Sequence, residues 1–122
     1  MPRVMIVEDD LTILSNLSQL LQLTGLDVME AHDGQEALRL LLECLVHDAS
    51  LPKMIVSDLM MPNMDGFDLL RAVRGDAHFK KLPFVLLSAR SDASDLQQAF
   101  ALGANDYLIK PFEVEQLMDV IR

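Results

Sequence analysis

The feature that most constrains this chain is the regular alternation of short apolar runs with longer segments of helical periodicity. The runs lie at 3–8, 27–31, 53–57, 84–87 and 106–109. Short, mostly apolar runs are typical of strands buried on both faces, as in a parallel sheet. Helical segments separate the runs, at 12–24, from Asp33 to His47 and Asp48, after Gly66, from Ser91 or Asp92 to Leu102, and from Glu113 to Arg122. Five such repeats predict an α/β fold, a doubly wound parallel sheet of five strands with right-handed crossovers.

Reactive side chains follow four of these runs, at the point where each strand is expected to end. They are Glu8, the last residue of the first run, with Asp9 directly after it, Asp58 after the third run, Ser88 after the fourth and Lys110 after the fifth. Ligands of open α/β sheets bind in the crevice outside the carboxyl ends of the strands, so these groups are expected to lie together. Acids around a cation-sized gap, with an ammonium group opposite, are the parts that Mg²⁺-assisted phosphoryl transfer onto a carboxylate requires.

Composition bounds the rest of the interpretation. The 122 residues suffice for one hydrophobic core, so we expect a single domain over 1–122. A net charge of −9 argues against direct nucleic-acid binding, because proteins that bind phosphate chains carry a basic surface.

No signal peptide or membrane-spanning apolar run is recognisable, so we expect no membrane contact and a cytoplasmic location. The last helix stops at Arg122 without a cap, from which we expect a domain excised from a longer protein. Cys44, the only cysteine, is expected in the core.

Helical spacing also predicts which residues each helix buries and where it begins. The apolar positions of the helix at 12–24 place on its inner side Ile13, Leu14, Leu17, Leu20 and Leu21. Asp10 directly precedes this helix and is expected to cap it rather than to bind metal. Asp33 and Glu36 form a capping-box pattern at the start of the second helix.

The strand-end groups and the segment after Asp58 together resemble the receiver domain of bacterial two-component response regulators. Residues 58–66, Asp-Leu-Met-Met-Pro-Asn-Met-Asp-Gly, closely match the loop that follows the phosphorylated aspartate of that family. Lys110-Pro111 and the aromatic Tyr107 also stand at matching positions. The resemblance covers residues 3–122 and implies a flavodoxin-like sheet with strand order 2-1-3-4-5.

The resemblance implies a role for each strand-end residue. Asp58 would accept a phosphoryl group, Lys110 would pair with Asp58 and then with a phosphoryl oxygen, and Ser88 would donate a hydrogen bond to another phosphoryl oxygen. The Lys110–Pro111 peptide would be cis. Mg²⁺ prefers oxygen ligands, and Mn²⁺ is expected to substitute for it. The implied metal ligands are Asp9, Asp58 and the backbone carbonyl of Met60, with Glu8 acting largely through water.

The implied function is that of a signalling switch. A histidine kinase or histidine phosphotransfer domain would supply the phosphoryl group, and the domain would catalyse only its own phosphorylation and a slow dephosphorylation. The loss is expected to be slow because Met60 and Arg90, at the family's tuning positions, offer no acid or amide to orient an attacking water. Ser88 and Tyr107 would transmit phosphorylation to the surface formed by the fourth helix, the fifth strand and the last helix. That surface would control an output domain or partner, and could also mediate a homodimer.

Several of these residues also have structural interpretations. Glu8 and Asp9 would then belong to a solvated loop, Ser88 would be an ordinary loop hydroxyl, and Tyr107 a core aromatic. A phosphohydrolase of the haloacid-dehalogenase type also uses a strand-end aspartate, but that family places a second acid two residues later, where Met60 stands. A receiver that serves only as an interaction module would lack one of the acids or the lysine, and all are present.

Overall fold

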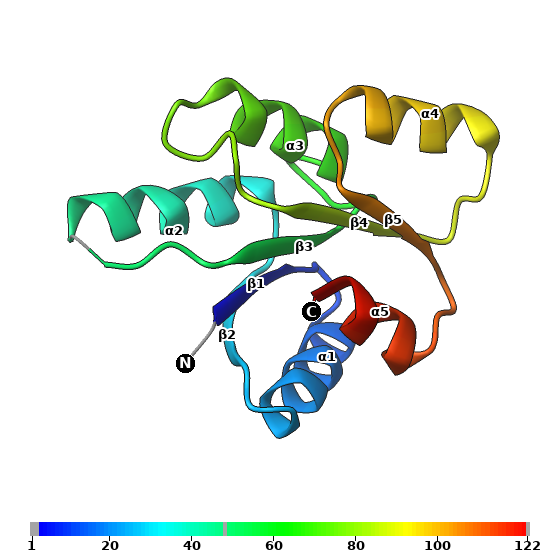
Figure 1. Cartoon of the computed structure of the whole chain (residues 1–122), viewed down its shortest axis with the longest axis horizontal. Coiled ribbons are helices and arrows are strands. Elements are labelled where there is room, and N and C mark those ends of the chain that lie inside the picture. The colour runs from blue at the N-terminus through cyan, green and yellow to red at the C-terminus, as the bar shows by residue number, and fades with distance from the viewer. Residues whose placement is uncertain (1–2, 48, 122) are drawn as a thin grey trace.

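Strands and helices alternate along the chain, as the periodicity predicts. The structure is a computed structural model that describes residues 3–47 and 49–121 (Figure 1). The strands are β1 Arg3–Val7, β2 Asp27–Ala31, β3 Met54–Asp58, β4 Phe84–Ser88 and β5 Asp106–Ile109. The helices are α1 Leu11–Leu23, α2 Gly34–Val46, α3 Gly66–Gly75, α4 Ala93–Ala101 and α5 Val114–Ile121. Asp48 and Arg122, where two predicted helices end, lie outside the described residues.

The five strands form one parallel sheet in the order β2-β1-β3-β4-β5. This confirms the doubly wound, flavodoxin-like α/β arrangement that the sequence predicts. Because all five strands are parallel and β1, β3, β4 and β5 are consecutive in this order, their carboxyl ends line one edge of the sheet.

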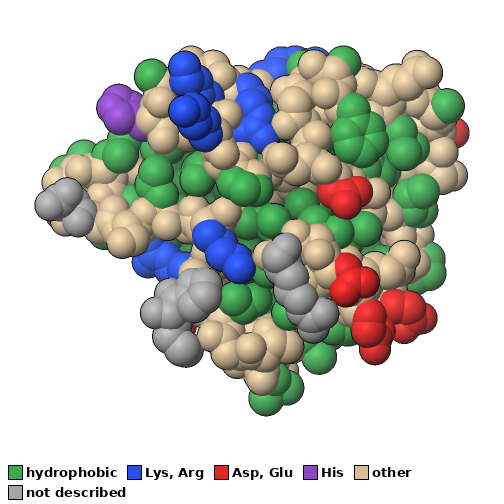
Figure 2. All heavy atoms as spheres, viewed as in Figure 1, with side chains coloured by type: hydrophobic (Ala, Val, Ile, Leu, Met, Phe, Trp, Pro, Cys, Tyr) green, Lys and Arg blue, Asp and Glu red, His purple; other side chains and the backbone are tan. Residues whose placement is uncertain are grey.

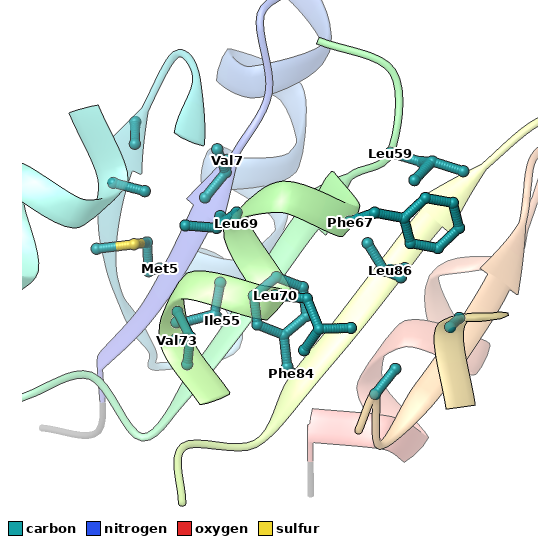
Figure 3. Packing of buried hydrophobic residues seen from close by; sticks show 14 of the residues in the cluster. Met5, Val7, Ile55, Leu59, Phe67, Leu69, Leu70, Val73, Phe84 and Leu86 are labelled. Carbon is teal, nitrogen blue, oxygen red and sulfur yellow. The ribbon is translucent and has the colours of Figure 1, made fainter. Parts of the chain in front are cut away.

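Alternate residues of the strands build two hydrophobic layers. Helices α1 and α5 cover one face of the sheet, and α2, α3 and α4 cover the other (Figure 1). On β1, Val4 and Ile6 belong to the layer with α1 and α5, whereas Met5 and Val7 belong to the layer with α2 and α3. Figure 3 shows α3 side chains packed over β3 and β4 in this second layer. The sheet is thus covered on both faces, and the predicted burial of Cys44 is confirmed.

The inner side of α1 differs from the prediction. The helix buries Leu14, Ser18 and Leu21, whereas Ile13 and Leu20 are 38% and 39% exposed. Ser18 faces inward because its hydroxyl donates to Glu30 Oε2 at 2.6 Å. The prediction was therefore wrong at Ile13 and Leu20. The apolar stripe on α1 is wider than the sheet covers, which leaves a second apolar face at the surface.

The end of α3 is joined to two distant segments through Arg74. Its guanidinium donates to the backbone carbonyls of Lys80, Leu82 and Gly103 and to Asn105 Oδ1, at 2.7–3.1 Å. These bonds fix the α3–β4 and α4–β5 connections against each other.

Charge is unevenly distributed over the surface. In Figure 2, Lys and Arg side chains gather at the top and left of the view, and Asp and Glu side chains lie on the right. None of the helices in the described ranges combines the length and the apolar character that crossing a membrane would need.

Candidate phosphoryl-acceptor site

Three carboxylates converge where β1 and β3 end. Val7 and Ser57 are paired in the sheet, so Glu8 and Asp58 directly follow neighbouring positions. One carboxylate oxygen from each of Glu8, Asp9 and Asp58 can be chosen so that all lie within 4.8 Å of one another. The structure thus brings together the three acids that the sequence singled out. A set of hard carboxylate oxygens at this spacing fits a divalent cation such as Mg²⁺.

Lys110 reaches this cluster from β5. Its Nζ donates to Asp58 Oδ1 at 2.8 Å and to Glu8 Oε1 at 3.2 Å. The backbone N–H of Lys110 also donates to the Ser88 carbonyl at 2.8 Å, which extends the β4–β5 pairing to the lysine. The Lys110–Pro111 peptide is cis, as the resemblance implies.

Glu8 and Asp9 differ in their surroundings. Glu8 is buried, and its second oxygen, Oε2, accepts the backbone N–H of Asp10 at 3.1 Å. Asp9 is exposed. Asp10 caps α1, as predicted, by accepting the N–H groups of Thr12 and Ile13 at 2.9 and 3.1 Å. Both Glu8 oxygens therefore already have protein partners, whereas Asp9 is open to solvent.

The electrostatics of the cluster follow from burial and mutual repulsion. Burial raises the pKa of Asp58 above its ordinary value, and Asp9 adds to the rise while Lys110 opposes it. Burial likewise raises the pKa of Glu8, and Asp58 adds to that rise. Burial alone would lower the pKa of Lys110, but its contacts with Asp58 and Glu8 outweigh burial and raise it. The lysine is thus held in its charged form between two carboxylates, each of which is costly to keep ionised.

Ser88 and Tyr107 meet at the peptide groups of Arg90. The buried Ser88 Oγ accepts the Arg90 N–H at 3.0 Å, and the Tyr107 hydroxyl donates to the Arg90 carbonyl at 2.9 Å. The Tyr107 ring is buried and belongs to the layer under α3 and α4. The Tyr107 ring is therefore turned inward in this structure.

The loop between β3 and α3 is closed tightly beside the acids. Leu59 accepts the Gly66 N–H at 2.9 Å and donates its own N–H to the Leu87 carbonyl at 2.9 Å. A Cβ at position 66 would lie 2.7 Å from the Asp58 carbonyl oxygen, so only glycine fits there. The Met60 side chain is exposed at the start of this loop.

An apolar groove that the sequence did not predict opens next to Lys110. It has a volume of about 490 Å³ and lies between α1 and the segment after β5. Its lining comprises Ile13, Leu17, Leu20, Ala89, Lys110, Pro111, Phe112 and Val114. The sequence held one signal of this groove. Helix α1 has more apolar positions than one helix face can bury against a sheet.

Comparison with known proteins identifies the family. Residues 4–122 match the response regulator receiver domain. The chain belongs to this family. The chain is 36% identical over 122 residues to the DNA-binding dual master transcriptional regulator RpaA of Synechocystis. The match covers all of this chain and 48% of the relative. It is 40% identical over 117 residues to the transcriptional regulatory protein PrrA of Mycobacterium tuberculosis, covering 96% of this chain and 47% of that protein.

Solved structures agree with the family. Chemotaxis protein CheY4 of Vibrio cholerae superimposes with a TM-score of 0.86 at 33% identity, covering 99% of this receiver domain and 96% of that chain. The receiver domain spans about half the length of the curated relatives it matches. The predictions of a receiver domain and of two-component signalling are thereby confirmed.

Proposed function

We propose that Asp58 accepts a phosphoryl group from a phosphohistidine of a histidine kinase or histidine phosphotransfer domain. The observation that carries this proposal is the 2.8 Å contact between Asp58 Oδ1 and Lys110 Nζ within a cluster of three acids. An Asp58 oxygen attacks phosphorus, the P–N bond breaks, and the histidine nitrogen keeps the electron pair and takes up a proton. The phosphoryl group is then held as an acyl phosphate.

The surrounding residues stabilise the charge that this transfer creates. Lys110 leaves its contact with Asp58 and donates to a phosphoryl oxygen, and the Ser88 hydroxyl donates to another. Ser88 Oγ acts as an acceptor toward Arg90, so the hydroxyl proton is not used in that contact and can be donated to the phosphoryl oxygen. A bound Mg²⁺ would neutralise the negative charge of the carboxylates and the phosphoryl group, and Mn²⁺ would substitute.

We assign the metal ligands according to whether the carboxylate oxygens of each acid already have hydrogen-bond partners in the protein. Asp9, Asp58 and the Met60 carbonyl would hold the ion directly. Glu8 acts through water, because its oxygens are engaged by Lys110 and Asp10. Asp9 should therefore contribute more to metal affinity than Glu8.

The apolar groove is proposed as part of the contact with the phosphohistidine-bearing protein. Lys110 and Ala89 belong both to the groove and to the strand ends that form the acceptor site. A protein that brings a histidine to Asp58 must cover the mouth of this site, so its flanking surface lies over the adjoining groove. The exposed apolar side chains of α1, Ile13 and Leu20, supply the area for that contact.

The output of the switch is assigned to α4, β5 and α5. Tyr107 on β5 contacts the segment that leads into α4 through the Arg90 carbonyl, so a displacement of Ser88 and Arg90 reaches this surface. An output domain, a partner or a second copy would bind there. The relative RpaA is a DNA-binding regulator, and DNA-binding regulators act in the cytoplasm of bacteria, so we place this exchange there.

Phosphorylation with acetyl phosphate tests the assignment. We expect intact-mass analysis to find one phosphoryl group on the wild-type protein, only when Mg²⁺ or Mn²⁺ is present, and none on Asp58→Asn. Equal phosphorylation of both proteins would refute Asp58 as acceptor. Because Met60 and Arg90 offer no acid or amide to orient an attacking water, the domain should lose the phosphoryl group slowly once the donor is removed.

Metal titrations of Asp9→Ala and Glu8→Ala test the ligand assignment. A larger loss of Mg²⁺ affinity is expected for Asp9→Ala. The reverse order would contradict the assignment of direct and water-mediated ligands.

A further inference from the structure

The carboxylate of Asp33 connects the start of α2 to the loop that follows the acceptor aspartate. Its Oδ1 accepts the Glu36 N–H at 2.9 Å and so caps α2. Its Oδ2 accepts from Asn63 Nδ2 at 3.1 Å, a contact between residues thirty positions apart. These two hydrogen bonds, the one from Glu36 first, hold the pKa of Asp33 below its ordinary value, so the carboxylate stays ionised in both roles.

A second contact supports the same junction. The Gly34 N–H donates to the Met64 carbonyl at 3.3 Å. The Met64 side chain lies directly over Gly34, because a Cβ at position 34 would be 2.7 Å from Met64 Cγ. The start of α2 and the far end of the loop are therefore packed too closely for any larger residue than glycine.

Asn63 has a backbone conformation suited to the apex of this loop. Its φ of 65° lies in the left-handed region, which asparagine enters more readily than most residues. The Met64 N–H donates to the Pro62 carbonyl at 2.7 Å across this turn, and the Gly66 N–H closes the loop onto Leu59. The loop is thus held at its base by its own hydrogen bonds and at its apex by Asp33.

We propose that Asn63 and Asp33 are positioning residues for the acceptor site: by holding the loop apex against α2, they fix where the Met60 carbonyl lies relative to the acids. This inference rests on the proposed function, in which that carbonyl binds the metal. A carbonyl contributes to a metal site only within a few tenths of an ångström of the correct position. A loop released at its apex must be ordered when the metal binds, and the cost appears as a lower affinity.

Exchanging the two side chains gives a charge-matched test. Asn63→Asp places two carboxylates against each other and should weaken Mg²⁺ binding about tenfold, within the range found for residues that orient metal ligands. The Asp33→Asn/Asn63→Asp double variant keeps the net charge and the α2 cap, reverses the hydrogen bond, and should restore wild-type affinity. Asn63→Gly retains the left-handed backbone without the amide and should show an intermediate loss.

The measurements are the Mg²⁺ dissociation constant from amide chemical shifts and the rate of phosphorylation by acetyl phosphate, with thermal unfolding of each variant. If the contact between Asp33 and Asn63 only stabilised the fold, the variants would unfold at a lower temperature. The double variant would then not regain wild-type Mg²⁺ affinity. If the carboxylate introduced by Asn63→Asp acted only through its negative charge, the variant would bind Mg²⁺ more tightly than the wild type. That change is the opposite of the one expected here. Either result, or unchanged affinity in Asn63→Gly, would overturn the inference. Failure of the proposed function is recognised separately, since the wild-type protein itself would then not be phosphorylated at Asp58.

Discussion

The Tyr107 hydroxyl donates a 2.9 Å hydrogen bond to the backbone carbonyl of Arg90 while the ring is buried beneath the layer of α3 and α4. Ser88 accepts the N–H of the same residue, Arg90, at 3.0 Å. One residue of the β4–α4 segment is therefore held by both side chains proposed to transmit phosphorylation. A movement of the Ser88 hydroxyl toward a phosphoryl oxygen must break or shift the Ser88–Arg90 contact, and the Tyr107–Arg90 contact carries that change to β5.

The first prediction concerns this pair of contacts. Tyr107→Phe keeps the buried ring but removes the hydroxyl, and a neutral hydrogen bond contributes about 1 kcal/mol, or about a fivefold change in a two-state population. We expect beryllofluoride, which stands in for the phosphoryl group, to shift the amide resonances of α4 less in this variant than in the wild type. Asp58→Asn is the control without a response. An undiminished response of α4 in Tyr107→Phe would mean that the signal bypasses the hydroxyl.

The second prediction concerns the stability of the metal-free protein. Burial first, and then Asp9, raise the folded-state pKa of Asp58 above its ordinary value of 3.8, despite the opposing effect of Lys110. The folded state then binds the proton more tightly than the unfolded state does, so this carboxyl lowers stability as pH rises through the raised pKa. At neutral pH, Asp58→Asn should therefore be more stable than the wild type, and the difference should shrink as pH falls toward 3.8.

Urea unfolding in the presence of a chelator, at a series of pH values, measures this difference. Asp10→Asn is the matched control, because Asp10 lies outside the acid cluster and an asparagine still caps α1. A destabilising effect of Asp58→Asn at neutral pH would mean that the ion pair with Lys110 outweighs the cost of burying the carboxylate.

The third prediction separates two arginines of α3. Arg74→Ala removes a charged group that donates to three backbone carbonyls and to Asn105, and should lower the free energy of unfolding by about 2 kcal/mol. Arg71→Ala removes only an exposed ion pair with Asp68 and should change it by about 0.5 kcal/mol or less. Chemical denaturation of both variants tests the contrast, and equal effects would contradict the role assigned to Arg74.

The sheet and the acid cluster could be predicted because both depend on regular geometry. Parallel strands buried on two faces have a recognisable composition, and their carboxyl ends share one edge, so Glu8, Asp58 and Lys110 had to converge. The family resemblance then supplied the strand order and the expected cis peptide at Lys110. No side-chain detail was needed for these conclusions.

Features that depend on irregular backbone were not predictable in the same way. The contact between Asp33 and Asn63 joins two loops, and its existence follows from one left-handed residue and one close approach at Gly34. The rotamer of Tyr107 depends on packing under α4. The inner side of α1 was misjudged because a leucine-rich helix has more apolar positions than one face, and Ser18 was not expected to turn inward.

The last prediction concerns the second apolar face of α1, which lies at the surface. Leu20→Ser places a hydroxyl in the groove beside Lys110 and should slow phosphotransfer from a phosphohistidine-bearing protein, by about tenfold if one buried apolar contact of 1–2 kcal/mol is lost. Phosphorylation by acetyl phosphate should be unchanged, because a small donor needs only the acids, the metal and Lys110. Leu23→Ser is the matched control on the same helix, since Leu23 is 84% exposed and lies outside the groove lining. Equal slowing by both substitutions, or equal slowing with both donors, would show that the groove has no specific part in recognising the protein donor.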